Sequence, residues 1–236
     1  METNQTKTET PFIIKIRGLH KEFNSRKVLQ GINLNVNRGD VLSIMGPSGS
    51  GKSTLLYCMA GILAVDQGEV LFDDQNIASY SPNDLIKLRR TSFGFIFQFG
   101  ELVPELPVRD NIALPLLLRG VKKNLAYKTA DEWAELVNVS DVISALPHTL
   151  SGGEIQRVAI ARAMAINPEV IFADEPTGSL DSVNAKKVMD LFVRLAHEHH
   201  KTVIIVTHSK ETADYADRLV TLKDGIIESD TVQTLL

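Results

Sequence analysis

The sequence predicts an α/β domain with a mainly parallel sheet as its core, an antiparallel portion near the N-terminus and an inserted α-helical subdomain. The first observation is that almost continuously apolar runs alternate with helical patterns, as strands covered by helices on both faces require. The second is an early run that alternates strictly between apolar and polar residues. The third is a long central stretch with helical patterns and no evident strand.

The elements are expected in the following order along the chain. Residues 32–37, INLNVN, have a period of two and predict a half-buried antiparallel strand. The expected parallel strands are the apolar runs 41–45 (VLSIM), 93–97 (FGFIF), 170–173 (VIFA) and 203–207 (VIIVT). Between them, residues 126–139 and 152–166 predict helices, with breaks at Pro104, Pro107, Pro115 and Pro147.

These patterns also set the expected organisation of the chain. We expect one domain over residues 12–236, with a helical subdomain of about 99–167 inserted into its core. The polar residues 1–11 are expected to form a disordered tail, and they lack the apolar stretch of a secretion signal. No run approaches the ~20 apolar residues needed to span a bilayer, so a membrane role would require a partner.

Composition limits the classes of function. With 236 residues and 44% hydrophobic content, the chain can bury a sizeable core. Its formal net charge of -4 gives no global attraction for nucleic acid, so we expect no nucleic-acid partner and a purely local site for any phosphate. The single cysteine, Cys58, excludes an internal disulfide and fits an intracellular core residue.

The segment GPSGSGKS, residues 46–53, fits the phosphate-binding pattern G-x-x-x-x-G-K-[ST] and is followed by the helical pattern STLLYCMAG. Glycines let backbone N–H groups converge on phosphate oxygens, and the helix N-terminus adds partial positive charge. Lys52 is expected to reach the terminal phosphates, and Ser53 to ligate Mg²⁺. A flexible loop whose lysine merely faces water is the alternative. The expected nucleotide-binding residues here are Gly46, Pro47, Ser48, Gly49, Ser50, Gly51, Lys52, Ser53 and Thr54.

A second glycine-rich helix start is LSGGEIQRVAIARA, residues 150–163. Ser151 and Glu154 match a capping box, which would be a purely structural role. Capping does not explain Gly152 and Gly153, because glycine weakens a helix by ~1 kcal/mol relative to alanine. We favour a backbone that a ligand approaches closely, such as the far side of a bound phosphate.

Five motifs, in this order, resemble those of the ATP-binding-cassette ATPases, and the resemblance covers nearly the whole chain. They are the phosphate-binding loop, a glutamine loop at Gln98, the LSGGE signature, the acidic strand end ADEPTGSLD and a late histidine, His208. The resemblance implies ATP hydrolysis with Mg²⁺ by a head-to-tail homodimer. Each ATP would lie between the phosphate-binding loop of one copy and the signature of the other, formed by Ser151, Gly152, Gly153 and Glu154.

The resemblance also assigns catalytic roles. Asp174 would face Mg²⁺ and Glu175 would act as general base, because neighbours on a strand point to opposite faces. Gln98 would sense Mg²⁺ and the attacking water, and His208 would contact the γ-phosphate. The expected catalytic set is Glu175, His208, Gln98 and Lys52, and the expected metal ligands are Ser53, Gln98 and Asp174.

Three further positions carry binding or metal hypotheses. Phe23 occupies the place of the aromatic that stacks on adenine, although an ordinary apolar residue at a strand end is the alternative. Asp181 lies in the loop that crosses the dimer interface in the family. The segment HEHH has His197 and His200 at a spacing that could share a helix face, but we favour solvated histidines at a helix end over a metal site.

The acidic segment ADEPTGSLDS is similar to that of the group formed by MacB, LolD and FtsE, particularly in Ala173 and Gly178. The pattern of Leu102, Pro104 and Leu106 agrees with this group. The departures from it lie in the region that receives the permease, at Gly100, Glu101 and Pro107, and bear on which partner is served.

This resemblance implies an ATP-hydrolysing subunit at the cytoplasmic face of the cell membrane. It would work with a separately encoded permease of MacB/FtsX-like architecture, for export or extrusion. An FtsE-like ATPase that signals across the membrane without transport is the alternative. A P-loop kinase should lack LSGGE, and the soluble cassettes of translation or DNA repair usually have two cassettes or a long coiled coil.

Overall fold

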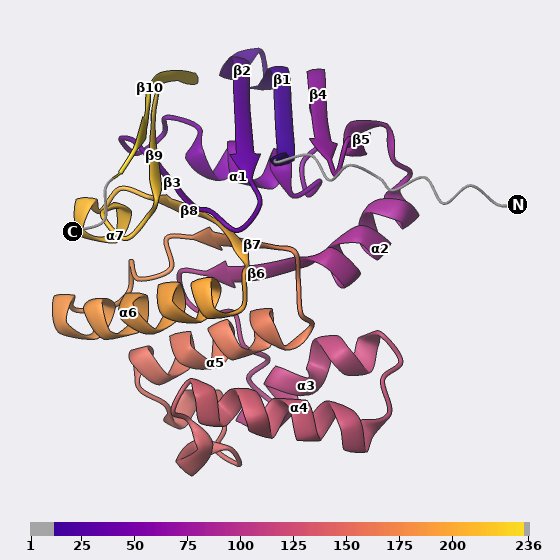
Figure 1. The fold of residues 1–236 in the computed structure, drawn as a ribbon, viewed down its shortest axis with the longest axis vertical. Coiled ribbons are helices and arrows are strands. Elements are labelled where there is room, and N and C mark those ends of the chain that lie inside the picture. The colour runs from indigo at the N-terminus through magenta and orange to yellow at the C-terminus, as the bar shows by residue number, and fades with distance from the viewer. Residues whose placement is uncertain (1–11, 234–236) are drawn as a thin grey trace, which may run out of the picture.

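The computed structural model describes residues 12–233 (Figure 1), so the tail predicted at 1–11 lies outside the described residues. Two sheets form the core of the molecule. The antiparallel sheet has the order β2-β1-β4-β5 and consists of β1 (Phe12–Phe23), β2 (Arg26–Asn37), β4 (Gln67–Phe72) and β5 (Gln75–Asn76). The larger sheet has the order β10-β9-β3-β8-β7-β6 and consists of β3 (Val41–Met45), β6 (Phe93–Phe97), β7 (Val170–Asp174), β8 (Thr202–Thr207), β9 (Arg218–Lys223) and β10 (Ile226–Val232).

The burial of these strands matches the sequence patterns that predicted them. Strands β3, β6, β7 and β8 pair in parallel, and nearly every residue of β3, β7 and β8 is buried because helices cover both faces. In β2, which pairs with β1 in antiparallel fashion, buried and exposed residues alternate over 32–36. The predicted fold class is therefore confirmed.

Seven α-helices surround the sheets in the described part of the chain. Their bounds are α1 (Lys52–Met59), α2 (Pro82–Ser92), α3 (Val108–Leu118), α4 (Lys123–Leu136), α5 (Gly152–Ala165), α6 (Ser182–Glu198) and α7 (Lys210–Ala213). Helices α3, α4 and α5 pack on one another at one end of the molecule, and α5 also contacts β6 (Figure 1). The helical subdomain predicted at about 99–167 corresponds to this layer, and its exact bounds stay a prediction.

Among the predicted proline breaks, the one at Pro115 is wrong. Pro115 lies inside α3, whereas Pro107 caps the start of α3 and Pro147 opens a short 3-10 turn. A proline in a helix interior removes one backbone hydrogen bond. In α3 this loss is offset because Val108, Ile112 and Ala113 are completely buried in the core that the helical layer shares with the sheet.

Helix α1 lies between the two sheets, with β1 and β2 on one side and β7 and β8 on the other. Cys58 on this helix is 2% exposed, and burial raises the pKa of its thiol to about 12. The expectation that Cys58 is a core residue is thus confirmed. Within residues 12–233, no helix combines the length and apolar character that crossing a bilayer requires.

Candidate functional site

The loop of residues 46–51 joins β3 to α1 and places the start of α1 at the edge of the parallel sheet. Gly51, directly before the helix, has a φ of 102°, which favours glycine, and no side chain caps the first turn of α1. The N–H groups of that turn are therefore free for an anion. Glycine is needed at position 46 for a different reason: a Cβ there would lie only 2.0 Å from the carbonyl oxygen of Leu222 in β9.

A cleft of about 590 Å³ opens beside this helix start. Its volume falls within the range of small-molecule sites. Phe23 lies at the cleft with 44% of its surface exposed, and the Lys21 ammonium lies 5.2 Å from the centre of its ring. An exposed ring at this position is what stacking on a base requires. The other lining residues are Arg26, Lys27, Val28, Gln30, Ser48, Gly49, Gly51, Lys52, Ser53, Thr54, Glu175, Asp224 and Gly225.

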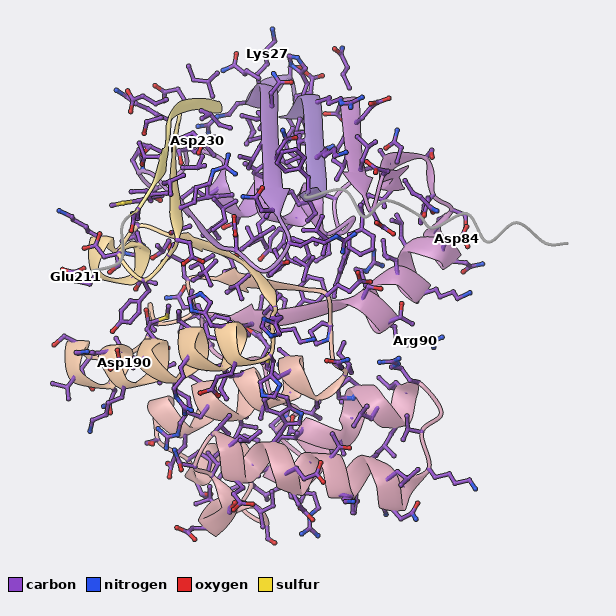
Figure 2. The ribbon with its side chains drawn as sticks, viewed as in Figure 1. Lys27, Asp84, Arg90, Asp190, Glu211 and Asp230 are labelled. Carbon is purple, nitrogen blue, oxygen red and sulfur yellow. The ribbon has the colours of Figure 1, made fainter. Side chains whose placement is uncertain are left out.

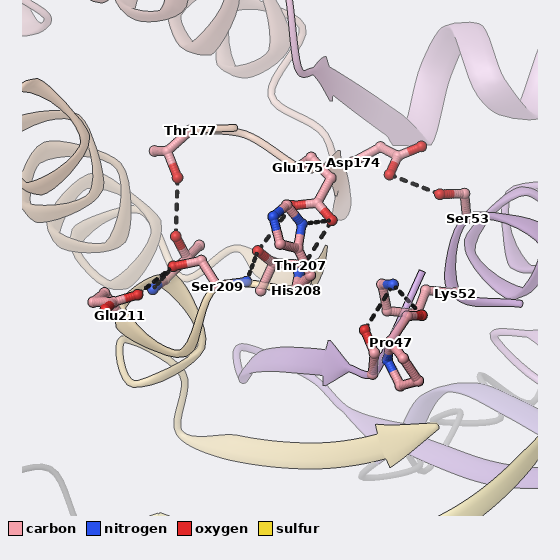
Figure 3. A network of polar contacts seen from close by, with 12 residues as sticks. Pro47, Lys52, Ser53, Asp174, Glu175, Thr177, Thr207, His208, Ser209 and Glu211 are labelled. Atoms are coloured by element: carbon pink, nitrogen blue, oxygen red, sulfur yellow. Dashed lines mark hydrogen bonds and ion pairs between the residues drawn. The ribbon is translucent and has the colours of Figure 1, made fainter. Parts of the chain in front are cut away.

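Lys52 is buried, with 8% of its surface exposed, and its side chain turns back over the phosphate-binding loop (Figure 3). Its ammonium donates to the carbonyl oxygens of Gly46 at 2.9 Å and Pro47 at 3.1 Å. These carbonyls are neutral acceptors, so a phosphate oxygen would be a stronger partner for the same ammonium.

Asp174 ends β7, and its carboxylate lies directly against α1 (Figure 3). Its Oδ1 accepts a hydrogen bond of 2.9 Å from the Ser53 hydroxyl, and its Oδ2 accepts one of 2.7 Å from the Tyr57 hydroxyl. Burial and then the hydrogen bond to Asp174 raise the pKa of Tyr57 above its ordinary range, so Tyr57 stays a neutral donor. The hydroxyl of Ser53 and the carboxylate of Asp174 are hard oxygen ligands side by side, which fits Mg²⁺.

Glu175 follows the strand and forms a separate network with the end of β8 (Figure 3). Its Oε1 lies 2.8 Å from Nδ1 of His208 and accepts from the His208 backbone N–H at 3.1 Å. Its Oε2 accepts from the Thr207 hydroxyl at 3.0 Å. A base held by an imidazole and a hydroxyl can be oriented toward a water molecule in the cleft that Glu175 also lines.

The two acids point in different directions, but not for the reason expected from strand alternation. Strand β7 ends at Asp174, and Glu175 already has a φ of 49°, in the left-handed region. This conformation is uncommon for a residue with a side chain and is found preferentially at functional sites. The turn, rather than the pleat of the strand, therefore directs Glu175 toward His208.

Gln98 and the LSGGE signature lie outside the lining of this cleft. The Ser151 hydroxyl and N–H donate to the Glu154 carboxylate at 2.6 and 2.7 Å, and Glu154 N–H donates back to the Ser151 hydroxyl at 3.4 Å. The first two bonds lower the pKa of Glu154. The predicted capping box is therefore present. A Cβ added at Gly153 would lie no closer than 3.6 Å to any neighbour, so packing within one chain does not require glycine at this position.

Asp181 serves as the N-terminal cap of α6. Its carboxylate accepts from the N–H groups of Val183 and Asn184, each at 3.0 Å, and the bonds from Asn184 lower the pKa of Asp181. The role of Asp181 at a dimer interface stays a prediction.

The two histidines weighed as a metal pair do not share a helix face. His197 lies in the last turn of α6, and its Nε2 is 3.3 Å from Oδ2 of Asp217. His200 lies beyond the end of the helix, with a φ of 51°.

Sequence reasoning missed several residues of the site, among them Tyr57, Thr207 and Asp224. Tyr57 lies four residues after Ser53, on the same face of α1, so helix periodicity could have pointed to it. Thr207 directly precedes His208, which is a weaker signal. Asp224 belongs to the turn between β9 and β10, far from the motifs in sequence, and only the fold brings it to the cleft.

Comparisons with known proteins agree with this geometry. The family model described as ABC transporter matches residues 29–178. The chain is 40% identical over 213 residues to "Lipoprotein-releasing system ATP-binding protein LolD" of Aquifex aeolicus, covering 90% of this chain and 95% of the relative. It is 39% identical over 222 residues to "Macrolide export ATP-binding/permease protein MacB" of Bdellovibrio bacteriovorus, covering 92% of this chain and 34% of that longer protein.

Among solved structures, the dimeric ATP-binding cassette MJ0796, in a post-hydrolysis state bound to ADP and Pi, is similar with a TM-score of 0.85 and 37% identity. The similarity covers 94% of this chain and 99% of that chain. The family model spans more than half of the chain, and the relatives extend the match over most of it. The chain belongs to the ABC transporter family and is an ATP-binding cassette of that family, an ATPase that uses ATP with Mg²⁺.

Proposed function

We propose that the chain is the ATP-hydrolysing subunit of a MacB-like membrane complex, in which ATP-driven closure of a dimer drives a separate permease for export or extrusion. The observation that carries the ATPase role is the cleft that brings the uncapped start of α1 together with Lys52, Phe23 and Glu175. The group is supported by the similarity to the LolD and MacB proteins.

In this proposal each group at the cleft has a distinct task. The N–H groups of the first turn of α1 and the ammonium of Lys52 hold and neutralise the terminal phosphates. Glu175, oriented by His208 and Thr207, accepts a proton from the attacking water. Mg²⁺, held by Ser53 and Asp174 with Gln98, would supply further neutralisation of the phosphate charge when bound.

The cleft of one chain lacks the signature, which supports a second copy as partner. We propose the head-to-tail homodimer, in which Ser151, Gly152, Gly153 and Glu154 meet the nucleotide of the other copy. Gly152 of the signature is exposed, so its backbone is accessible to such an approach. The cassette MJ0796 is dimeric in its solved structure.

Replacing Gly153 with aspartate tests this composite site. Within the monomer, an acid at the second position of α5 is favourable because it opposes the positive end of the helix dipole. In the dimer, the same carboxylate would face the γ-phosphate of the partner's ATP and repel it. We expect ATPase activity to fall by at least about 100-fold, since a like-charge contact across an interface costs several kcal/mol, while the monomer keeps its melting temperature and its ATP binding.

The matched control is Asn124→Asp, at the second position of α4, where the exposed side chain belongs to no part of the site. It should leave ATPase activity unchanged. Wild-type turnover in Gly153→Asp would show that the signature does not face nucleotide.

The permease is proposed to dock in an apolar groove of about 550 Å³ that lies between β6, α2 and α3. Ile86, Leu114 and Leu118 line it, while Arg90 and Glu101 give it charged groups of both signs. Figure 2 shows Arg90 on the side of the molecule where α2 faces α3, and its guanidinium donates to the Leu118 carbonyl oxygen at 3.4 Å. An amphipathic segment of a MacB/FtsX-like permease would fit, placing the cassette at the cytoplasmic face of the membrane.

The departures noted at Gly100 and Glu101 lie beside this groove. Both residues have a positive φ, and a Cβ at Gly100 would lie 2.6 Å from Cγ2 of Ile155 in α5. A residue with a Cβ at position 100 would therefore require the Ile155 side chain to move, which supports a permease contact particular to this chain.

An FtsE-like ATPase, whose closure signals to a partner without transport, uses the same site. The two functions differ in what the permease does. The membrane protein that copurifies with the cassette should be reconstituted in vesicles, and uptake of labelled lipoprotein, macrolide or peptide should be measured with ATP and with the Glu175→Gln cassette. ATP-dependent transport supports export, whereas ATP hydrolysis without movement of any of these cargoes favours signalling.

A further inference from the structure

Gly178, one of the positions at which the chain is similar to the MacB, LolD and FtsE group, and its neighbour Ser179 both lie against Gln98. The Ser179 hydroxyl donates to the Gln98 carbonyl oxygen at 2.8 Å. A Cβ at Gly178 would lie 3.0 Å from Nε2 and 3.2 Å from Cδ of Gln98. One residue therefore holds the backbone of Gln98, and the other gives its side-chain amide room to lie against the turn.

The turn that carries these two residues is anchored independently of Gln98. The Gly178 N–H donates to the Glu175 carbonyl oxygen at 3.0 Å, and the Leu180 N–H donates to that of Thr177 at 3.0 Å. The Thr177 hydroxyl is buried and lies 2.9 Å from the hydroxyl of Thr212 in α7. The turn is thus a fixed support that begins at the proposed general base.

The residues on either side of Gln98 are held from a different direction, by α5. The buried Gln156 amide donates to the Phe97 carbonyl oxygen at 3.1 Å. The Arg162 guanidinium donates to the carbonyl oxygens of Gly100 at 2.6 Å and Glu101 at 2.7 Å. Ser179 therefore supplies the contact between the Gln98 backbone and the Glu175 turn. The two α5 side chains tie the neighbours of Gln98 to the helix that starts with the signature.

We propose that Gly178 and Ser179 are positioning residues that set where the Gln98 amide lies relative to Glu175. This inference rests on the proposed function of the cleft. The Gly-Ser pair couples the position of the 175–181 turn to the position of Gln98. A shift of the turn would move the Gln98 carbonyl through its hydrogen bond with Ser179, and it would change the space that Gly178 leaves beside the Gln98 amide. A residue with a Cβ at 178 and no hydroxyl at 179 would release Gln98 from this control.

The test compares Ser179→Ala, Ser179→Thr and Gly178→Ala with a matched control, Ser182→Ala, which removes an exposed hydroxyl three residues further on. We expect Ser179→Ala to lower kcat about three- to ten-fold, the size of one lost hydrogen bond, with unchanged KM for ATP and unchanged melting temperature. Ser179→Thr keeps the donor and should retain wild-type kcat. Gly178→Ala should lower kcat by displacing the amide, and Ser182→Ala should change nothing.

A double-mutant cycle with Gln98→Ala separates positioning from a general effect on the loop. If Ser179 acts through the Gln98 amide, Ser179→Ala will cause no further loss of kcat in the Gln98→Ala background. Additive losses, or equal kcat in Ser179→Ala and wild type, would overturn the inference while leaving the ATPase function intact. Absence of ATP hydrolysis by the wild-type chain would instead contradict the proposed function.

Discussion

Replacing Glu175 with glutamine will stop ATP turnover and leave ATP binding intact. The amide oxygen can still accept from the two His208 donors at 2.8 and 3.1 Å, and the amide NH2 can donate to the Thr207 hydroxyl, which lies 3.0 Å from the other carboxylate oxygen, so the local geometry is kept. The amide cannot take a proton from water, and a positioned general base contributes about 10²- to 10⁴-fold. We therefore expect kcat to fall at least about 100-fold, measured as phosphate release, with the dissociation constant for ATP within about twofold of wild type.

The control for this variant is Glu132→Gln, which makes the same chemical change on the exposed face of α4. It should hydrolyse ATP at the wild-type rate. If Glu175→Gln also hydrolyses ATP at a rate near wild type, measured with its permease, Glu175 is not the general base.

Replacing Lys52 with alanine will remove tight nucleotide binding. Among the described residues, the Lys52 ammonium donates only to the neutral carbonyl oxygens of Gly46 and Pro47, at 2.9 and 3.1 Å. Lys52 lies at the uncapped start of α1, where the phosphates would bind. Hydrogen bonds to charged groups are worth about 1.5–3 kcal/mol, so losing this one should weaken ATP binding by about 10- to 100-fold. Titration calorimetry with ATP and Mg²⁺ measures the change directly.

Lys27→Ala is the matched control for Lys52→Ala. Lys27 also lines the cleft, but it lies at the outer end of the β1–β2 hairpin (Figure 2). A purely general attraction of positive charge for ATP would make the two variants equal. The proposed site requires a much larger loss for Lys52→Ala, and comparable losses would contradict it.

The parallel strands could be predicted because full burial leaves a continuous apolar run between breaks, as in VIIV at 203–206. Strand β1 could not, because register shifts interrupt its pairing with β2 and Gly18 has a φ of 55° within it, so no period of two survives. Helix α3 was obscured by Pro115, whose cost is outweighed by tertiary burial that a local pattern does not record.

The candidate site likewise has features that the sequence predicts and features that only the fold supplies. The phosphate-binding loop is a local motif, so its residues and its helix could be read directly from the sequence. The contact of Ser179 with Gln98 joins residues 81 apart, and the left-handed turn at Glu175 leaves no mark in composition or periodicity. The fold supplies these features because parallel strands bring the carboxyl ends of β6, β7 and β8 to one edge of the sheet.

The central claim, that ATP is bound between the phosphate-binding loop of one copy and the signature of another, is tested most directly by the mass of the Glu175→Gln chain in solution. Light scattering should be recorded with Mg²⁺, with and without saturating ATP. The account predicts the mass of one chain without ATP and of two chains with ATP. The double variant Glu175→Gln/Gly153→Asp should have the mass of one chain even with saturating ATP. A single chain at saturating ATP, with nucleotide bound, would contradict the account.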